Sequence, residues 1–480
     1  VLFRSGELQS TSARWAASEE RTSDKALEAT PVVEMLTAGV RRALFLVFGA
    51  AALVLLLAAV NVASLLLTRI GGRSREIAVR HALGARGGRI ASQLLVEGLM
   101  LGALGALVGV GLLAASLDVV RMFAAETLPR VSGVRIDFRV VAVAVGAAFA
   151  SALAFSVAPA LNARARAMAN ALRGARAVGS RDESRTLGAL VVAEVALAAT
   201  LVIVAALLMR SFLLLSQEPL GFSPEGVALG EVVLPEARYG TVEAQSRAVA
   251  AMVARVAREP GVQAAGWLVG TPLSGGCCMG HTVLREGVTV APADEQGARF
   301  RAFHGDVFGA LGIAVARGRP PLATDLAAGE RVAWVNERFA RQFFGDADPV
   351  GQRIAWKPGE VYDEAGGPQW MRIVGVVRDL RAVSMRQGDD AAVYALYLQR
   401  DADWVRFGHL VARVSGDPAT YREAFGQSVA DVDAALPLAS FETMPGRVRA
   451  ALAGDRFALQ LVGGFGAIAL LLGLQGVFGV

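Results

Sequence analysis

Long uninterrupted apolar runs are the feature that most limits the folds open to this sequence. A helix needs about 20 predominantly apolar residues to cross the hydrocarbon core of a bilayer. Four segments meet this need, and a fifth begins at Phe457 and is still apolar at Val480; the four are residues 44–67, 94–117, 140–161 and 187–215. With 54% hydrophobic and only 19% charged residues, the chain is also too apolar for a typical soluble protein. The sequence therefore predicts a membrane protein with an α-helical transmembrane bundle.

The basic residues gather in two short loops beside these runs. Residues 69–93 hold six Arg and one Glu, and residues 162–187 hold six Arg and two acidic residues. Short loops with such an excess stay in the cytoplasm. Residues 118–139, with four Arg and three acids, lack it and are predicted on the opposite side. The alternation puts residues 216–455, with 24 basic and 29 acidic side chains, outside the cytoplasm, and the net charge of +5 then needs no nucleic-acid partner.

The outside region has the pattern of a mixed α and β domain. It begins with a strand–helix–strand order, predicted at 227–234, 241–259 and 262–269. The same order recurs near its end, with a strand at 409–414, a helix carrying Tyr421, Phe425, Val429 and Val432, and a strand within 437–444. Two such units predict a split ferredoxin-like sandwich. Between them lies an insertion, residues 275–400, with a strand at 372–377 and a short helix within 335–344.

The two cysteines, Cys277 and Cys278, are adjacent, so no disulfide framework is predicted. Together with Met279 and His281 they offer the donors of a copper(I) site. A Gly-bounded loop that happens to hold these residues is the simpler interpretation, and we expect no metal there.

Motifs for catalysis are not found in the sequence. A phosphate-binding loop needs a Lys after a Gly-rich turn, and the two lysines, Lys25 and Lys357, follow Asp24 and Trp356. The sequence has neither a His-Glu-x-x-His pair nor a Gly-x-Ser-x-Gly elbow. We expect a chain that is not an enzyme and binds no cofactor itself.

Small and polar residues interrupt the predicted spans. Glycines four apart let helix backbones approach closely, and two such pairs predict helix packing: Gly98 and Gly102, then Gly105 and Gly109. Asn61, Glu97 and Glu194 are polar groups within or near the ends of spans, where ionisable residues are functional candidates. Because Glu97 and Glu194 lie near the predicted cytoplasmic end, we favour a structural role for both.

The first basic loop contains a short amphipathic helical pattern. Ser74 is placed to cap it, Glu76 and Arg80 are four residues apart in the favourable acid-then-base order, and Gly84 is placed to end it. Such a helix, lying along the cytoplasmic face, has two possible uses. Its arginines can bind anionic lipid headgroups, or its exposed face can dock a cytoplasmic protein.

A resemblance decides between these uses. The stretch "NVASLLLTRIGGRSREIAVRHALGARGGRIASQLLVEGLMLGALGALVGVGL" (61–112) is similar, nearly position by position, to the signature of FtsX-like permease domains. Recurring sequence motifs of the periplasmic core of MacB-like permeases resemble three stretches of this chain, residues 300–319, 332–354 and 372–381. Two departures concern this outside domain: no aromatic precedes Phe308 in "GDVFGALGI", and a Cys-Cys loop is unusual for the family.

The resemblance implies a fold class and a division of the chain. The fold is an FtsX-like transmembrane bundle with an α+β extracytoplasmic domain. The six expected parts are residues 1–42, the tail of a preceding periplasmic domain; 43–161, an FtsX-like domain with three transmembrane helices; 162–186, a basic cytoplasmic linker; 187–215, a transmembrane helix; 216–455, a MacB-like periplasmic core; and 456–480, the start of a second FtsX-like domain.

The order of these parts resembles a branch in which two permease units are fused and no ATPase domain is attached. A modest sequence similarity between residues 41–62 and 455–477 agrees with this duplication. The sequence opens without Met, and its first five residues, "VLFRS", can be encoded by sequencing-adapter read-through, so we expect a fragment of a longer protein.

The resemblance also implies partners and a site. A coupling element would contact a separate cytoplasmic ATP-binding-cassette ATPase, on which ATP and Mg are bound; its members are Arg75, Glu76, Arg80, Gly84 and Arg86. The resemblance further implies a multi-pass protein of a bacterial inner membrane that contacts membrane lipid. We also expect a dimer or pseudo-dimer of permease units, a periplasmic adaptor and an outer-membrane channel.

The expected function is the permease subunit of an ATP-driven export or envelope-remodelling system. The alternative is a non-transporting regulator that activates a periplasmic partner such as a cell-wall hydrolase, and a weaker possibility is a membrane-anchored sensor. The resemblance does not name a substrate.

Overall fold

The computed structural model divides the chain into two compact units. The helical unit comprises Val1–Phe212 and Gly454–Val480, and the α+β unit comprises Leu213–Ala453. The residues that the structure describes are 32–72, 87–124, 137–139, 141–151, 153, 180–274, 280–291, 294–326, 329–361, 367–382, 384–386, 388–400 and 403–479.

Four long helices lie in the described part of the helical unit: α2 (Val32–Gly72), α4 (Gly87–Ala124), α6 (Ser180–Ser216) and α12 (Ala453–Gly479). Each contains a segment long and apolar enough to cross a membrane, at Leu44–Leu65, Gly98–Ala115, Leu187–Ser216 and Ala453–Phe478. These segments confirm four of the five predicted apolar spans. In the predicted span 140–161, the described residues form a shorter apolar helix, Val141–Ser151. The number of membrane crossings stays a prediction.

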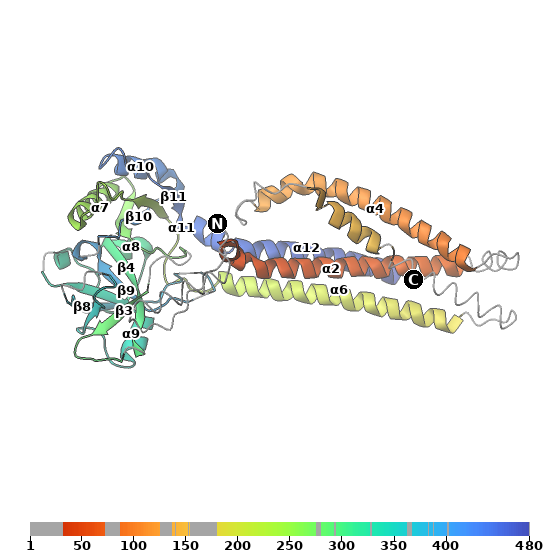
Figure 1. The fold of residues 1–480 in the computed structure, drawn as a ribbon, viewed down its shortest axis with the longest axis horizontal. Helices are drawn as coiled ribbons and strands as arrows, with labels where there is room; N and C mark the ends of the chain where they lie inside the picture. Colours follow the sequence, from red (N-terminus) through yellow and green to blue (C-terminus); the bar gives the residue numbers. More distant parts are fainter. Residues whose placement is uncertain are drawn as a thin grey trace, which may run out of the picture. The chain divides into compact units, whose positions relative to one another are not determined.

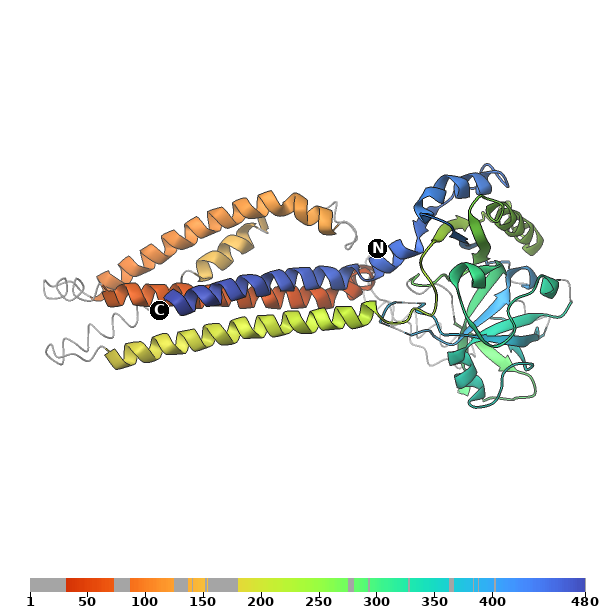
Figure 2. The same ribbon diagram turned by 180° about the vertical axis from the view of Figure 1, so that it is seen from behind.

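Helices α2, α6 and α12 pack against one another, and they run side by side in Figure 1 and from behind in Figure 2. Leu57 of α2, Leu201 of α6 and Val462 of α12 are fully buried in a shared apolar cluster. Large apolar side chains on their other faces are exposed, among them Phe48 and Leu471. Exposed apolar side chains are stable in lipid and unstable in water, which agrees with the predicted membrane location.

One half of the α+β unit has the split ferredoxin-like topology. Its elements are β1 (Val227–Val233), α7 (Val242–Val256), β2 (Val262–Leu268), β10 (Phe407–Val414), α10 (Arg422–Ala430) and β11 (Ser440–Thr443). The strand order is β11-β1-β10-β2, and all three pairings are antiparallel. This arrangement confirms the two predicted strand–helix–strand units and their assembly into one sheet.

Local sequence explains the first of these units. The Thr241 side chain accepts a hydrogen bond from the Ala244 N–H and so caps α7. The apolar face predicted for this helix is buried, including Val249 and Met252, and packs on the sheet. Gly261 has φ of 84°, a conformation that Gly adopts without strain, and turns the chain into β2.

The insertion between β2 and β10 forms a closed six-stranded barrel. Strands follow one another in the order β4-β3-β7-β8-β6-β9, and β9 pairs again with β4. The bounds are β3 (Gly280–Arg285), β4 (Gly297–Gly305), β6 (Val332–Asn336), β7 (Arg353–Trp356), β8 (Met371–Val377) and β9 (Ala392–Leu396), with β5 (Val315–Gly318) added on β8. Pairing of β2 with β4 joins the barrel to the ferredoxin-like sheet. The sequence predicted strands here but not their closure.

The α+β unit also contains short helices: α8 (Val307–Leu311), η3 (Ala323–Leu326), α9 (Glu337–Phe344), η5 (Tyr397–Gln399) and η6 (Pro418–Tyr421) lie between strands, and α11 (Met444–Ala451) follows the last strand. Helix α9 is the short helix that the sequence predicted within 335–344. Asn336 caps it by accepting the Phe339 N–H, and Phe339 and Phe343 stack on its buried face.

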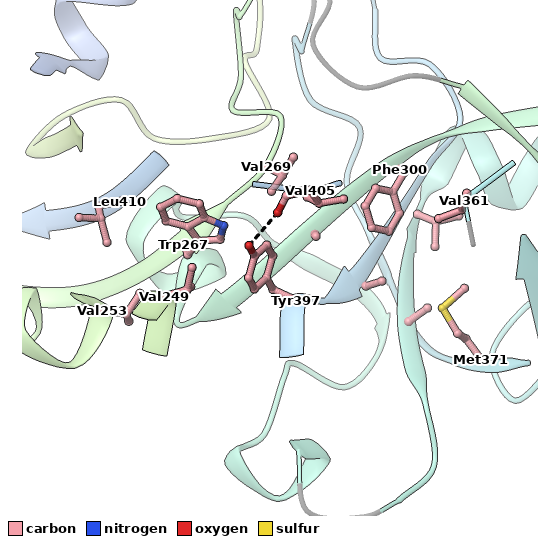
Figure 3. Close-up of a cluster of buried hydrophobic side chains, with 14 of the residues drawn as sticks. Val249, Val253, Trp267, Val269, Phe300, Val361, Met371, Tyr397, Val405 and Leu410 are labelled. Atoms are coloured by element: carbon pink, nitrogen blue, oxygen red, sulfur yellow. Dashed lines mark hydrogen bonds between the residues drawn. The ribbon is translucent and has the colours of Figure 1, made fainter. Parts of the chain in front are cut away.

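An aromatic cluster lies where the barrel meets the ferredoxin-like sheet (Figure 3). The Trp267 ring meets the Tyr397 ring edge-on at 5.9 Å between centroids, and the Tyr397 hydroxyl donates to the Val405 carbonyl at 2.8 Å. A Cβ added at Gly408 would lie 2.5 Å from the Trp267 ring, so only Gly fits beside this indole. The two halves of the unit therefore share one packed core.

Candidate functional site

The predicted coupling residues lie outside the described residues. Arg75, Glu76, Arg80, Gly84 and Arg86 all fall between the end of α2 and the start of α4. Their role stays a prediction. Cys277, Cys278 and Met279, the other side chains considered as copper(I) donors, also lie outside the described residues.

His281, the described member of that donor set, is buried in β3. Its ring lies 5.8 Å from the Trp356 ring, and burial lowers the pKa of His281. Among the described residues, no three His, Cys, Asp or Glu side chains come together in a way that could hold a metal.

The glycines predicted for helix packing lie along α4. Gly98 is buried, whereas Gly105 and Gly109 are exposed, and a Cβ added at either of the latter would meet no atom within 4 Å. Within the described residues, Gly105 and Gly109 therefore contact no other helix, and their packing role stays a prediction.

The close helix contacts involve glycines that sequence reasoning did not single out. A Cβ added at Gly466 would lie 3.6 Å from the Ala205 Cβ, and one added at Gly473 would lie 3.5 Å from the Ala198 Cβ. These glycines are seven residues apart, two helical turns, and so lie on one face of α12. The signal that could have found them is this spacing opposite the alanines of α6.

Two of the polar residues singled out in the spans come together in the helical unit. Asn61 of α2 is buried, and its Nδ2 donates to the Leu472 carbonyl of α12 at 2.8 Å. Glu194 of α6 is fully buried, with Asn61 as its polar neighbour, and a Cβ added at Gly476 of α12 would overlap its carboxyl group. Three helices thus contribute to one buried polar cluster. Glu97 lies within α4, and its side chain is outside the described residues.

The end of the α+β unit is held by Arg447, which sequence reasoning missed. Arg447 lies on α11, and α12 begins two residues after α11 ends. Its Nη1 donates to Thr271 Oγ1 at 2.5 Å and to the Pro272 carbonyl at 3.1 Å, and its Nη2 pairs with Glu442. The Nη2 also lies 3.3 Å from His409 Nε2 on β10. The guanidinium therefore joins α11 to β10, β11 and the loop after β2.

The His409 ring is part of the same cluster. Burial, and after it the positive charge of Arg447, lowers the pKa of His409 to about 4, and the carboxylates of Glu231 and Glu442 oppose this. The ring is consequently neutral at pH 7. We call Arg447, His409, Glu442 and Thr271 the exit cluster.

The beginning of the α+β unit is fixed in a similar way. After α6 ends at Ser216, the Glu218 carboxylate pairs with Arg381, and the Arg381 backbone N–H donates to the Leu220 carbonyl at 2.9 Å. Gly221 follows with φ of 77°, and an added Cβ would overlap the Asp379 carbonyl. The chain is thus attached to the residues just after β8 as soon as it leaves α6.

The fold defines a membrane protein in which a folded α+β domain lies between apolar helices in the sequence. A family model for the FtsX-like permease C-terminal domain matches residues 48–168, and one for the MacB-like periplasmic core domain matches residues 188–425. The chain therefore belongs to the permeases that combine an FtsX-like domain with a MacB-like periplasmic core domain.

A curated relative is the macrolide export ATP-binding/permease protein MacB of Azoarcus sp. (strain BH72). It is 34% identical over 113 residues, which are 24% of this chain and 16% of that protein. The chain thus matches about a sixth of the length of this relative.

Two solved structures are similar to the chain. One is the periplasmic region of MacB from Actinobacillus actinomycetemcomitans, with 10% identity and a TM-score of 0.33, covering 48% of this chain and 94% of that one. The other is the extracellular domain of the noncanonic ABC-type transporter YknZ from Gram-positive bacteria, with 12% identity and a TM-score of 0.30, covering 45% and 98%.

Proposed function

We propose that this chain is the membrane subunit of an ATP-driven export or envelope-remodelling system in a bacterial inner membrane. A separate cytoplasmic ATPase would bind the loop that contains Glu76 and Arg80, and its cycle would move the membrane helices. The α+β unit would lie in the periplasm and respond to that movement, while ATP and Mg would be bound on the partner. Membership of the permease family supports the proposal.

The observation that carries the proposal is the attachment of the α+β unit at both ends. Helix α6 leads into it through the Glu218–Arg381 pair, and α11, held by Arg447, leads out into α12. Both attachments use charge-assisted hydrogen bonds, which are stronger than neutral ones. In the proposed function, a movement of α6 or α12 would reach the α+β unit at these two attachments.

Replacing the acidic or basic member of the predicted coupling element tests the proposal. In the full-length protein, Glu76→Ala and Arg80→Ala should reduce recovery of the ATPase encoded beside it and reduce ATPase stimulation. Arg139→Ala is the matched control, since Arg139 is exposed and predicted on the opposite side of the membrane. Unchanged recovery and unchanged stimulation in both variants would refute the coupling role. A loss graded with the number of arginines removed would indicate lipid binding instead.

The neighbouring genes separate the exporter from the regulator. Adaptor and outer-membrane channel genes beside the ATPase gene would support export. A cell-wall hydrolase gene in that place would support the regulator, in which the same α+β unit acts on a periplasmic enzyme.

A further inference from the structure

The buried polar cluster in the helical unit has acceptors without donors. Asn61 is 5% exposed and Glu194 is 0% exposed. Asn61 Nδ2 donates to the Leu472 carbonyl, which leaves Asn61 Oδ1 without a hydrogen-bond partner among the described residues. Both carboxyl oxygens of Glu194 also have no hydrogen-bond partner there. Three buried oxygens of two neighbouring side chains therefore lack a donor.

An ionised Glu194 cannot donate a hydrogen bond to Asn61 Oδ1. A carboxylate and an amide oxygen both accept hydrogen bonds and cannot bond to each other, whereas a neutral carboxylic acid has one O–H donor. Among the described residues, no Arg or Lys forms an ion pair with Glu194. An unpaired carboxylate inside a membrane bundle is strongly unfavourable.

The packing around Glu194 holds its carboxyl group in place. Gly476 of α12 lies against the carboxyl group, and any larger residue would overlap it. One and three turns along the same helix, Gly473 and Gly466 bring α12 close to Ala198 and Ala205 of α6. Because α12 approaches so closely, the carboxyl group stays beside Asn61 and away from solvent.

We propose that Glu194 binds a proton and, as a neutral acid, donates a hydrogen bond to Asn61 Oδ1. The ligand of this site is the proton, and the result is a chain of hydrogen bonds across three helices. Glu194 links α6 to α2, and Asn61 links α2 to the Leu472 carbonyl of α12. We call this arrangement the Glu194 lock. It does not depend on the proposed ATPase coupling.

Infrared difference spectroscopy tests the proton directly. The full-length protein and its Glu194→Gln variant are compared in lipid at pH 7, in water and in deuterium oxide. The expected difference spectrum contains the C=O stretching band of one protonated carboxylic acid, which shifts on deuteration and is absent from the variant. A difference spectrum with only carboxylate bands would overturn the proposal.

Disulfide cross-linking tests the link between helices. Cysteines are placed at Ala198 and Gly473, whose Cβ positions are 3.5 Å apart and suit a disulfide, after Cys277→Ser and Cys278→Ser remove the native thiols. Glu194→Gln keeps a donor and should cross-link at the parent rate. Glu194→Ala and Asn61→Ala should each be slower by roughly threefold or more, because interhelical hydrogen bonds in membranes contribute about 0.6 kcal/mol on average.

A matched control and a double variant complete the test. Thr200→Ala on α6 should leave the rate unchanged, since this exposed hydroxyl bonds to the Ala196 carbonyl of its own helix. The Glu194→Ala/Asn61→Ala double variant should be no slower than either single variant, because the two side chains share one interaction. Fully additive losses, or a Glu194→Gln variant as slow as Glu194→Ala, would overturn the lock. None of these measurements involves an ATPase, so they fail or succeed separately from the proposed function.

Discussion

Replacing Arg447 by Met should weaken the α+β unit at the point where the chain leaves it. The substitution keeps an unbranched apolar stem and removes the guanidinium. That group is largely buried, with 10% of the side chain exposed, and it donates to Thr271, to the Pro272 carbonyl and to Glu442. Loss of the donor leaves the Thr271 and Glu442 oxygens to find water or remain unsatisfied.

The magnitude follows from the number and kind of bonds lost. A hydrogen bond from a charged group contributes about 1.5–3 kcal/mol, and bonds that share one guanidinium are not additive. Glu442 is 39% exposed and can regain water, which reduces its share. We therefore expect the free energy of unfolding to fall by about 2–4 kcal/mol at pH 7.

The same variant should respond differently to acid. His409 has a pKa of about 4 in the folded protein, below the ordinary value of 6.5, so its contribution to stability is complete above pH 6.5 and is lost as the pH falls towards 4. Between pH 7 and pH 5 this group alone should cost the parent about 2 kcal/mol. Removing the Arg447 charge raises the pKa of His409, so the variant should lose less from this group over the same interval.

Urea unfolding of a fragment spanning residues 213–453, at pH 7 and pH 5, measures both effects. Arg449→Met is the matched control, because Arg449 lies exposed on the same helix and its loss should change stability by less than about 0.5 kcal/mol. If the Arg447 and Arg449 variants are equally stable, or if the Arg447 variant is as sensitive to acid as the parent, the reasoning about the exit cluster is wrong.

Three further predictions concern other parts of the chain. Asp389→Ala breaks a buried ion pair, in which Asp389 lies 2.6 Å from Arg301, and should lower the free energy of unfolding by about 3–5 kcal/mol in chemical denaturation. The control Asp390→Ala breaks the more exposed pair with Arg299 and should cost under about 1 kcal/mol. Equal losses in the two variants would contradict this prediction. Gly476→Ala should push the Glu194 carboxyl group away from Asn61 and slow formation of the disulfide between cysteines at positions 198 and 473. Gly464→Ala is the control and should not slow it, because a Cβ added at Gly464 meets no atom within 4 Å. Similar cross-linking rates in the two variants would contradict the proposed packing of Gly476 against Glu194. Thr241→Ala should cost about 1 kcal/mol through the lost α7 cap, measured by thermal unfolding, and no change would mean that the cap is unimportant.

Local patterns were sufficient for much of the fold. The apolar helices were found because every residue of a membrane span must be compatible with lipid, so the signal is concentrated in one segment. The two strand–helix–strand units were found because strand and helix place apolar residues at different spacings, as Val249 and Met252 on α7 illustrate. The closed barrel was missed because its last pairing is a parallel one between Arg299–Phe303 and Ala392–Leu396, which no local pattern encodes.

The candidate site was predictable to a smaller extent. Glu194 and Asn61 stood out because polar residues are rare in apolar runs, but their proximity to each other and to Leu472 involves positions more than 100 residues apart. Arg447 is one Arg among many and gains its importance from Thr271, Glu442 and His409, which reach it from separate elements.

The sequence by itself determined that the chain has apolar membrane helices, two basic loops and a mixed α and β domain, because composition and periodicity act within single segments. It also determined the family resemblance, through a stretch that includes the coupling element at Glu76 and Arg80. Only the tertiary structure decided which buried oxygens lack donors, which glycines let α6 and α12 approach, and which Arg holds α11 to the rest of the α+β unit. These are properties of distances between distant parts of the chain, and such distances are set by packing.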